Sequence, residues 1–142
     1  MTFLTLQNLE KTFGANRVVK DFSLTVEQGE FVSLLGPSGC GKTTVLRMVA
    51  GFEAPTAGQI EINGADVTGL KPNQRNIGMV FQSYALFPNL TVAENVAFGL
   101  KLQGADAAAR ERIVADTLRL VGLADVAGKR TWQLSGGMRQ RV

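Results

Sequence analysis

Histidine is absent from the 142-residue sequence, and cysteine occurs only once, as Cys40. The absence of histidine excludes zinc sites built on imidazole, Ser-His catalytic triads and histidine general bases. A single cysteine excludes an intramolecular disulfide framework and is typical of proteins from a reducing compartment. The sequence also has no run of about 18 apolar residues, and its N-terminus lacks a basic stretch followed by an apolar core. We therefore expect neither a membrane-spanning helix nor a signal peptide.

A strong excess of one charge is also lacking. The 15 Lys and Arg residues and the 12 Asp and Glu residues leave a net charge of +3, spread along the sequence. This pattern falls short of the clustered basic surface of nucleic-acid-binding proteins, so no nucleic-acid partner is expected. Hydrophobic residues make up 45% of the sequence. That share and the length together indicate one globular domain rather than a disordered chain.

Glycine is abundant, with 16 residues, and it is clustered rather than periodic. One cluster lies between Gly36 and Gly41, and the other is the pair Gly136-Gly137. Clustered glycine is typical of backbone that closely approaches a ligand.

Apolar residues in the first half predict strands. Alternation over residues 3–9 and 22–26 indicates two half-buried antiparallel strands. Ile60 and Ile62, followed by the turn pair Asn63-Gly64 and by Val67, predict a hairpin. The short apolar run of residues 31–35 predicts a strand buried on both faces, and residues 77–81 predict another short strand.

The remaining patterns predict helices. Residues 43–50 indicate a helix that ends at Gly51 and whose apolar face carries Val45, Leu46, Val49 and Ala50. Thr91 and Glu94 have the spacing of a capping box that opens a second helix. A helical stripe over residues 105–121 predicts a third, so the second half is expected to be mainly helical.

Between the run of residues 31–35 and the first helix stands Gly-Pro-Ser-Gly-Cys-Gly-Lys-Thr, residues 36–43, which has the Walker A spacing. A polyphosphate needs several converging donors, and such a loop supplies backbone N–H groups from about residue 39 to residue 44 at the positive end of a helix. Lys42 is expected to bridge the β- and γ-phosphates, Thr43 to bind Mg²⁺ and Thr44 to bond the α-phosphate. The nucleotide-binding set in this loop is Gly36, Ser38, Gly39, Cys40, Gly41, Lys42, Thr43 and Thr44.

Two other interpretations of this loop are weaker. An ordinary glycine turn would not need the strand and helix that flank it. A dinucleotide fingerprint would need a third glycine, but Thr44 stands at that position. We therefore expect an α/β fold with a P-loop NTPase core, an N-terminal antiparallel β-subdomain and a helical subdomain. The boundary is expected near residue 82, with the β-subdomain and P-loop core in residues 1–82 and the helical subdomain in residues 83–142.

The last nine residues, Leu-Ser-Gly-Gly-Met-Arg-Gln-Arg-Val, resemble the signature motif of ATP-binding cassette (ABC) transporter ATPases. The Walker A loop, the glutamine of Val80-Phe81-Gln82 and this signature occur in the order of that family, and the resemblance covers essentially the whole chain. Residues 76–100 are especially similar to importer ATPases of the polyamine, ferric-iron, phosphonate and sugar group.

The resemblance implies roles for further residues. Phe13 matches the aromatic position that stacks on adenine. Gln82 matches the Q-loop glutamine, whose amide reaches Mg²⁺ or the attacking water, so Thr43 and Gln82 are the expected metal ligands. Ser135, Gly136 and Gly137 match signature residues that contact the γ-phosphate of ATP held by another subunit. Lys42, Gln82 and Ser135 are thus the expected catalytic residues. Structural alternatives stay open: a Phe13 packed into the β-subdomain, a polar strand end at Gln82, and an N-cap before a flexible turn at Ser135.

The function that the resemblance implies is that of the ATP-binding subunit of an ABC importer, which couples ATP binding and hydrolysis to solute uptake. Its implied partners are a second ATPase subunit in a head-to-tail dimer, transmembrane permease subunits and, indirectly, a solute-binding protein. Residues 84–90, from Tyr84 to Leu90, are expected to help form the cleft that receives a helix of the permease. The implied location is the cytoplasmic face of the cell membrane.

After the signature, the family pattern continues with the Walker B strand, the catalytic glutamate and the switch histidine, which these 142 residues do not include. We therefore expect an incomplete ABC ATPase domain that by itself binds nucleotide weakly and hydrolyses it poorly. A non-catalytic nucleotide-binding fragment is one alternative. A non-transport ABC-type ATPase is less favoured, since no sustained heptads separate Thr44 from Leu134. A small-molecule kinase would explain the Walker A loop but not Gln82 or the signature.

Overall fold

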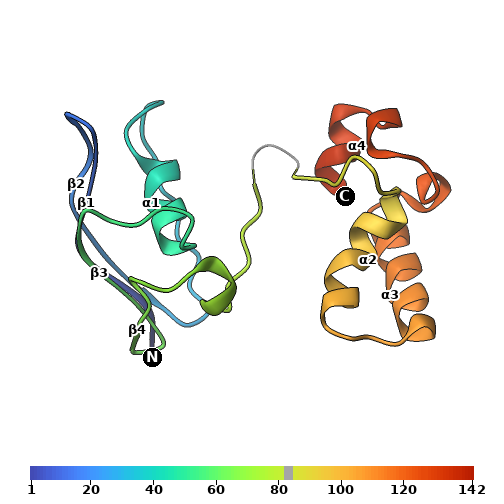
Figure 1. The fold of residues 1–142 in the computed structure, drawn as a ribbon, viewed down its shortest axis with the longest axis horizontal. Helices are drawn as coiled ribbons and strands as arrows, with labels where there is room; N and C mark the ends of the chain where they lie inside the picture. Colours follow the sequence, from blue (N-terminus) through green and yellow to red (C-terminus); the bar gives the residue numbers. More distant parts are fainter. Residues whose placement is uncertain (82–84) are drawn as a thin grey trace. The chain divides into compact units, whose positions relative to one another are not determined.

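The computed structural model describes residues 1–81 and 85–142. They form two compact units, Met1–Met79 and Val80–Val142, called here the N-terminal unit and the C-terminal unit. The N-terminal unit combines a sheet with a helix, and the C-terminal unit is helical (Figure 1). The expected α/β organisation, with antiparallel strands first and helices later, is thereby confirmed.

Four antiparallel strands form the sheet of the N-terminal unit, in the order β2-β1-β3-β4. Their bounds are Thr2–Phe13 for β1, Asn16–Glu27 for β2, Ala57–Ile62 for β3 and Ala65–Asp66 for β4. The predicted N-terminal strands and the predicted hairpin are all present. Asn63 and Gly64 both have positive φ, 51° and 75°, as a type I′ turn requires. Val67 follows β4 rather than lying in it, and it is buried.

Helix α1, Lys42–Val49, packs on this sheet. Its predicted apolar face was partly wrong. Val45 and Ala50 are buried as expected, but Leu46 is 51% exposed and Met48 is fully buried. Because residues three apart lie on the same side of a helix, Val45 and Met48 together face the core. The core cluster comprises Leu6, Leu9, Val19, Val45, Met48, Ile60, Ile62 and Val67.

Truncation of Met48 tests this core. Met48→Ala is expected to lower the free energy of unfolding by about 2–5 kcal/mol, because the substitution removes buried apolar atoms and leaves a cavity. Urea unfolding followed by circular dichroism measures the change. The matched control is Leu120→Ala, whose side chain is 86% exposed and whose effect is expected to stay within about 0.5 kcal/mol. A loss of less than about 1 kcal/mol for Met48→Ala would contradict the packing described.

Two predicted strands are not strands in the structure. Among the described residues, neither 31–35 nor 77–81 belongs to the sheet. The prediction that residues 31–35 are buried on both faces is also wrong, since Phe31 is 92% exposed and Leu35 is 90% exposed. The physical reason is that a strand is held by hydrogen bonds to a neighbouring strand, and the four strands of the sheet pair with each other and not with these runs.

The C-terminal unit contains α2 (Val92–Leu102), α3 (Ala107–Leu120) and α4 (Gly136–Arg141). Two 3₁₀ turns, Ala124–Val126 and Thr131–Gln133, lie between α3 and α4, and a third, Pro72–Gln74, lies in the N-terminal unit. The core of the C-terminal unit comprises Val92, Val114, Leu118, Leu123, Val126 and Leu134. Among the residues that the structure describes, no helix has the length and apolar character needed to cross a membrane.

The capping box of α2 is confirmed. The Glu94 backbone N–H donates to the Thr91 hydroxyl at 3.2 Å, and the Thr91 backbone N–H donates to the Glu94 carboxylate at 2.7 Å. Hydrogen bonds from Thr91 to the Glu94 carboxylate, above all from the Thr91 backbone N–H, favour its charged form and hold the pKa of Glu94 below its ordinary value. Helix α3 begins two residues later than predicted because Asp106 caps it by accepting from the Ala109 N–H.

Candidate functional site

The glycine loop of residues 36–41 joins the exposed run of residues 31–35 to α1. Gly41 is the N-cap of α1 and has a φ of 95°, in the left-handed region that favours glycine. A Cβ at Gly41 would also lie 2.9 Å from the Val18 carbonyl oxygen and 3.2 Å from the Val19 Cγ2 atom. The position therefore excludes any side chain for two reasons, conformation and space.

Lys42 folds back across this loop. Its Nζ donates to the carbonyl oxygens of Gly36 and Pro37, both at 2.7 Å, and lies 3.4 Å from the Cys40 sulfur. The side chain thus connects the first residue of α1 to the opposite end of the glycine loop. Among the described residues, no carboxylate forms an ion pair with this ammonium group, so the loop is locally positive.

The N-terminal end of α1 offers further donors. Gly41 supplies no side-chain cap, so the first N–H groups of the helix have no intrahelical carbonyl to bond. Thr43 is exposed, and within the described part of the chain its hydroxyl makes no hydrogen bond; Thr44 is half-buried. Free N–H groups, a lysine ammonium and a hydroxyl are the donor and ligand types that suit a phosphate and its Mg²⁺ ion. The loop therefore fits a magnesium-bound polyphosphate chemically.

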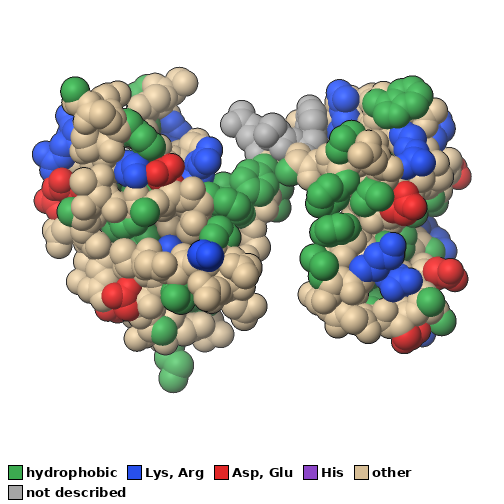
Figure 2. Space-filling view, in the orientation of Figure 1, with side chains coloured by type: hydrophobic (Ala, Val, Ile, Leu, Met, Phe, Trp, Pro, Cys, Tyr) green, Lys and Arg blue, Asp and Glu red, His purple; other side chains and the backbone are tan. Residues whose placement is uncertain are grey.

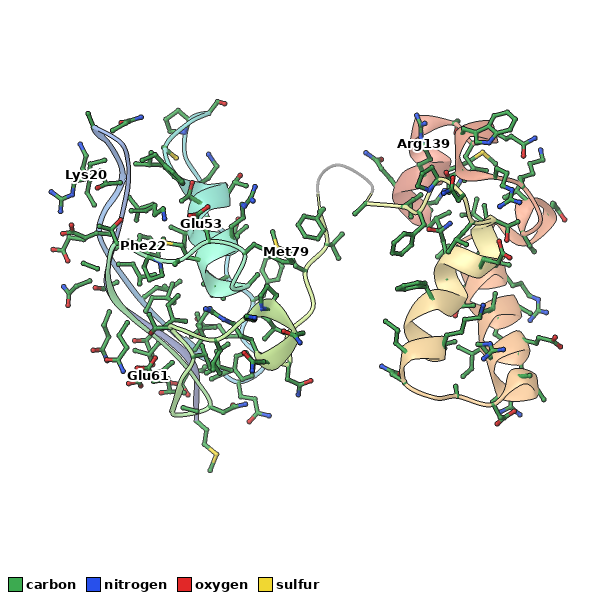
Figure 3. All side chains as sticks on the ribbon, viewed as in Figure 1. Lys20, Phe22, Glu53, Glu61, Met79 and Arg139 are labelled. Atoms are coloured by element: carbon green, nitrogen blue, oxygen red, sulfur yellow. The ribbon has the colours of Figure 1, made fainter. Side chains whose placement is uncertain are left out.

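A cleft of about 720 Å³ opens beside the loop. It is lined by the start of β2, Asn16–Lys20, and by Gly39–Lys42 among others. Lys20 and Phe22, which Figure 3 labels on β2, also line it, so the cleft combines cationic and aromatic side chains. A second hollow of about 210 Å³ adjoins Lys42, Thr43 and Thr44. Both volumes are in or near the range of small-ligand sites.

Phe13 ends β1, and its backbone pairs with Asn16, a residue that lines the cleft. The ring is 47% exposed, so it is not part of the buried core cluster. The Lys11 ammonium lies 4.9 Å from the ring centroid, within the range of a cation–π contact. Lys11 is fixed there by Glu53, whose carboxylate lies 2.6 Å from its Nζ. A partly exposed ring near the cleft is compatible with the predicted stacking role, which stays a prediction.

The other predicted site residues lie elsewhere. Gln82 and Tyr84 lie outside the described residues. Ser135 is the N-cap of α4 in the C-terminal unit, and its hydroxyl accepts from the Met138 N–H at 3.3 Å. Gly136 and Gly137 form the first turn of that helix. The structure therefore brings the residues from Gly36 to Thr44 together in one unit and the signature residues together in the other.

Residues 87–91 form a second region of interest, held by side chains that the sequence patterns did not identify. Asn95 accepts from the Phe87 N–H at 2.8 Å and donates to the Thr91 carbonyl oxygen, also at 2.8 Å. Arg130 donates to the Asn89 carbonyl oxygen and lies 3.9 Å from the Glu94 carboxylate. These two side chains connect the loop of residues 87–91 to α2 and to the segment that precedes the signature.

A half-exposed apolar surface lies beside this loop. The Phe87 ring is 45% exposed and stacks on Phe98 of α2, with the centroids 4.4 Å apart. Figure 2 shows hydrophobic side chains gathered over α2 on the viewed face of the C-terminal unit. No periodic pattern in the sequence indicated Asn95 or Arg130, because both act through hydrogen bonds to loop backbone, in the case of Arg130 to a carbonyl 41 positions away.

Comparison with known proteins identifies the family. The family model of ABC transporters matches residues 19–142. The spermidine/putrescine import ATP-binding protein PotA of Thermobifida fusca is 54% identical over 143 residues, which cover 98% of this chain and 37% of that protein. The Fe(3+) ions import ATP-binding protein FbpC of Rhizobium etli is 52% identical, covering 98% of this chain and 39% of that protein.

A solved structure is similar as well. It is the dimeric structure of a post-hydrolysis state of the ATP-binding cassette MJ0796 bound to ADP and Pi, with a TM-score of 0.87 and 32% identity over 97% of this chain and 66% of that one. The chain spans less than two fifths of the length of the PotA and FbpC relatives. Because the family model matches far more than half of the sequence, the chain belongs to the ABC transporter family.

Proposed function

We propose that the protein is the ATP-binding subunit of an ABC importer, in which ATP binding and hydrolysis are coupled to solute uptake. The observation that carries the proposal is the glycine loop at the N-terminal end of α1, with Lys42 folded across it and an uncapped first turn. The names of the PotA and FbpC relatives support import, and the ADP and Pi of the MJ0796 structure support nucleotide hydrolysis.

In this proposal the phosphate loop binds and orients the nucleotide. The free N–H groups of α1 would bond phosphate oxygens, with the positive end of the helix favouring their charge. Lys42 would exchange its bonds to the Gly36 and Pro37 carbonyl oxygens for bonds to the β- and γ-phosphates. Thr44 would bond the α-phosphate, and the Phe13 ring would stack on adenine.

Thr43 and Gln82 are the proposed protein ligands of Mg²⁺. The exposed Thr43 hydroxyl next to the phosphate loop is suitably placed on the chain for this role. Mg²⁺ prefers oxygen ligands and is commonly held by few protein groups together with substrate phosphates. The bound ion would neutralise the charge that develops on the transferred phosphoryl group.

The proposed partners follow from the two separate sets of site residues. Ser135, Gly136 and Gly137 would contact the γ-phosphate held by the Walker A loop of a second ATPase subunit, so that a head-to-tail pair encloses two nucleotides. The dimeric state of the MJ0796 structure supports this arrangement. Permease subunits, reached at the cytoplasmic face of the membrane, would complete the transporter, and a solute-binding protein would act through them.

Nucleotide binding and hydrolysis by the protein expressed from its own gene test this proposal. A fluorescent ATP analogue is expected to bind in the presence of Mg²⁺ and to be displaced by ATP. Phosphate release is expected to stop with vanadate or with EDTA, because the reaction needs the γ-phosphate site and the metal. Failure to bind the analogue would contradict the proposal at its first step, and phosphate release that persists in EDTA would contradict the role of Mg²⁺.

Phe87 offers a test of the permease contact. Phe87→Asp is expected to lower co-purification of the membrane subunits by about tenfold or more, because it places a carboxylate in an apolar contact surface. The affinity for the ATP analogue is expected to change by less than about twofold, since Phe87 lies in the unit that lacks the phosphate loop. The measurement is a tagged pull-down from native membranes, alongside an analogue titration.

The matched control is Leu120→Asp, which places the same charge on a side chain of α3 that is 86% exposed. It is expected to leave both co-purification and nucleotide binding unchanged. Loss of nucleotide binding in Phe87→Asp would mean that Phe87 acts as a structural residue instead.

A further inference from the structure

Arg75, in the N-terminal unit, is a buried cation that is held entirely by backbone carbonyls. Its side chain is 4% exposed. Nη1 donates to Met48 O at 2.7 Å and to Val49 O at 2.9 Å. Nε donates to Leu70 O and Nη2 to Thr68 O, both at 2.9 Å. Within the described residues, Arg75 forms no ion pair.

The four hydrogen bonds fix the position of the buried Arg75 guanidinium. Burial lowers the pKa of Arg75, an effect that the charge of Asp66 partly opposes, yet a guanidinium stays protonated in proteins. A buried charge is costly unless it is hydrogen-bonded, so the loss of any of the four bonds would leave a buried donor without an acceptor and would be unfavourable. Gly51 leaves the space for them, since a Cβ there would lie 2.7 Å from the Arg75 Nε.

Two of the four carbonyls belong to the C-terminal end of α1. Met48 and Val49 are the last residues of the helix that begins at Lys42. Carbonyls at a helix end lack intrahelical partners and carry partial negative charge, which a guanidinium complements. Helix α1 has 8 residues and is about 12 Å long, so it behaves as one rigid rod between the phosphate loop and Arg75.

The other two carbonyls belong to the loop that follows β4. Arg75 itself ends the 3₁₀ turn Pro72–Gln74 and directly precedes residues 76–79, which lead toward Gln82 in the sequence. One side chain therefore joins the end of the phosphate-loop helix to the segment of residues 68–79.

We propose that Arg75 is a positioning residue that couples occupancy of the phosphate loop to the order of residues 68–79. The inference rests on the proposed function, because it needs a nucleotide at the loop. When phosphate fixes the N-terminal end of α1, the rigid helix fixes the Met48 and Val49 carbonyls, and Arg75 then holds residues 68 and 70 in place. Nucleotide binding is thereby communicated along the chain toward Gln82.

Hydrogen exchange of the protein expressed from its own gene tests the coupling. A non-hydrolysable ATP analogue with Mg²⁺ is expected to slow amide exchange both in residues 39–46 and in residues 68–79, the latter by about fivefold or more. In Arg75→Met and Arg75→Lys, the slowing at residues 39–46 is expected to persist while that at residues 68–79 is lost, because neither side chain can make all four bonds.

The matched control is Arg47→Met, which removes an exposed arginine from the last turn of the same helix and is expected to behave like the wild type. Gly51→Ala provides a variant that retains Arg75 but crowds its Nε, and it is expected to reduce the slowing at residues 68–79. Circular dichroism melts show which variants are folded, and the wild-type result stands whether or not Arg75→Met folds.

The outcomes separate the two proposals. If the analogue slows exchange in neither region of the wild type, the proposed function fails, and this inference fails with it. If it slows exchange only at residues 39–46 of the wild type, nucleotide binding stands and the coupling is wrong. Equal slowing at residues 68–79 in the wild type and in a folded Arg75 variant would also overturn the role of Arg75.

Discussion

Replacement of Lys42 by alanine, in the protein expressed from its own gene, is expected to lower the rate of ATP hydrolysis by about 10²–10³-fold and to weaken nucleotide binding. Lys42 is the charge nearest to the glycine loop carbonyls, with its Nζ 2.7 Å from Gly36 O and from Pro37 O. The fold is expected to survive, because both carbonyls are on exposed residues where water replaces the lost donor. Phosphate release and titration with a fluorescent ATP analogue measure the two effects.

Lys101→Ala is the matched control for Lys42→Ala. It removes the same charge from the last turn of α2, in the other unit, and is expected to change neither rate nor affinity by more than about twofold. Hydrolysis by Lys42→Ala at more than about a tenth of the wild-type rate would contradict a role for Lys42 in charge stabilisation.

Replacement of Ser135 by aspartate is expected to leave nucleotide affinity within about twofold of the wild type and to lower hydrolysis by about 10²-fold or more. Asp is as good an N-cap as Ser, so α4 keeps the bond that Ser135 now accepts from Met138. The added negative charge would oppose the γ-phosphate of the facing subunit. Binding and phosphate-release assays on the same preparation separate the two quantities.

Ser135→Asn is the control that isolates charge, since Asn caps helices as well as Asp does but is neutral. It is expected to lose far less hydrolysis than Ser135→Asp. Equal losses in the two variants would contradict the charge argument, because both variants lack the Ser135 hydroxyl and only one of them adds a negative charge. Weakened binding of the analogue to Ser135→Asp would instead mean that the signature acts on the nucleotide of its own subunit.

The two variants together test the head-to-tail arrangement. In a mixed dimer of Lys42→Ala and Ser135→Asp subunits, one nucleotide site carries both changes and the other carries neither. After equimolar mixing, about half of the dimers are mixed, and each mixed dimer has one intact nucleotide site of its two. About a quarter of all sites are then intact, so the hydrolysis rate is expected to recover to about a quarter of the wild-type rate. No recovery on mixing would contradict a site shared between subunits.

Each strand that the sequence predicted correctly has at least one pairing partner that follows or precedes it directly in the chain. Phe22, Leu24 and Val26 of β2 alternate with polar residues, β1 pairs with β2 across a short turn, and Asn63-Gly64 has the backbone conformation that its hairpin demands. In β1 the alternation is only rough, since the buried Leu6 and Leu9 are three positions apart and the register with β2 shifts between them. Residues 31–35 are equally apolar, but an apolar run specifies only suitability for burial. Whether it becomes a strand depends on a neighbour with free hydrogen-bonding groups, which local pattern does not reveal.

The candidate site was predictable where backbone conformation and spacing determine it. The glycines of the phosphate loop and the start of α1 at Lys42 follow from such local rules. The bonds of Arg75 to the Met48 and Val49 carbonyls do not, because they join residues 27 and 26 positions apart through tertiary packing. The bonds of Lys42 to the Gly36 and Pro37 carbonyls span only six and five positions, but hydrophobic periodicity does not indicate which carbonyl a long cationic side chain will contact.

The order of the strands has a consequence for how the protein folds. Leu4 of β1 pairs with Ile62 of β3, so the sheet closes only when two segments 58 positions apart have met, and α1 lies in the chain between them. Contacts in the C-terminal unit are more local, since α2 and α3 are consecutive helices. Local contacts form fast and distant strand pairs form slowly. During refolding, the helical signal of the C-terminal unit would therefore return first, and the phosphate loop would acquire its final shape only after β1 and β3 have paired.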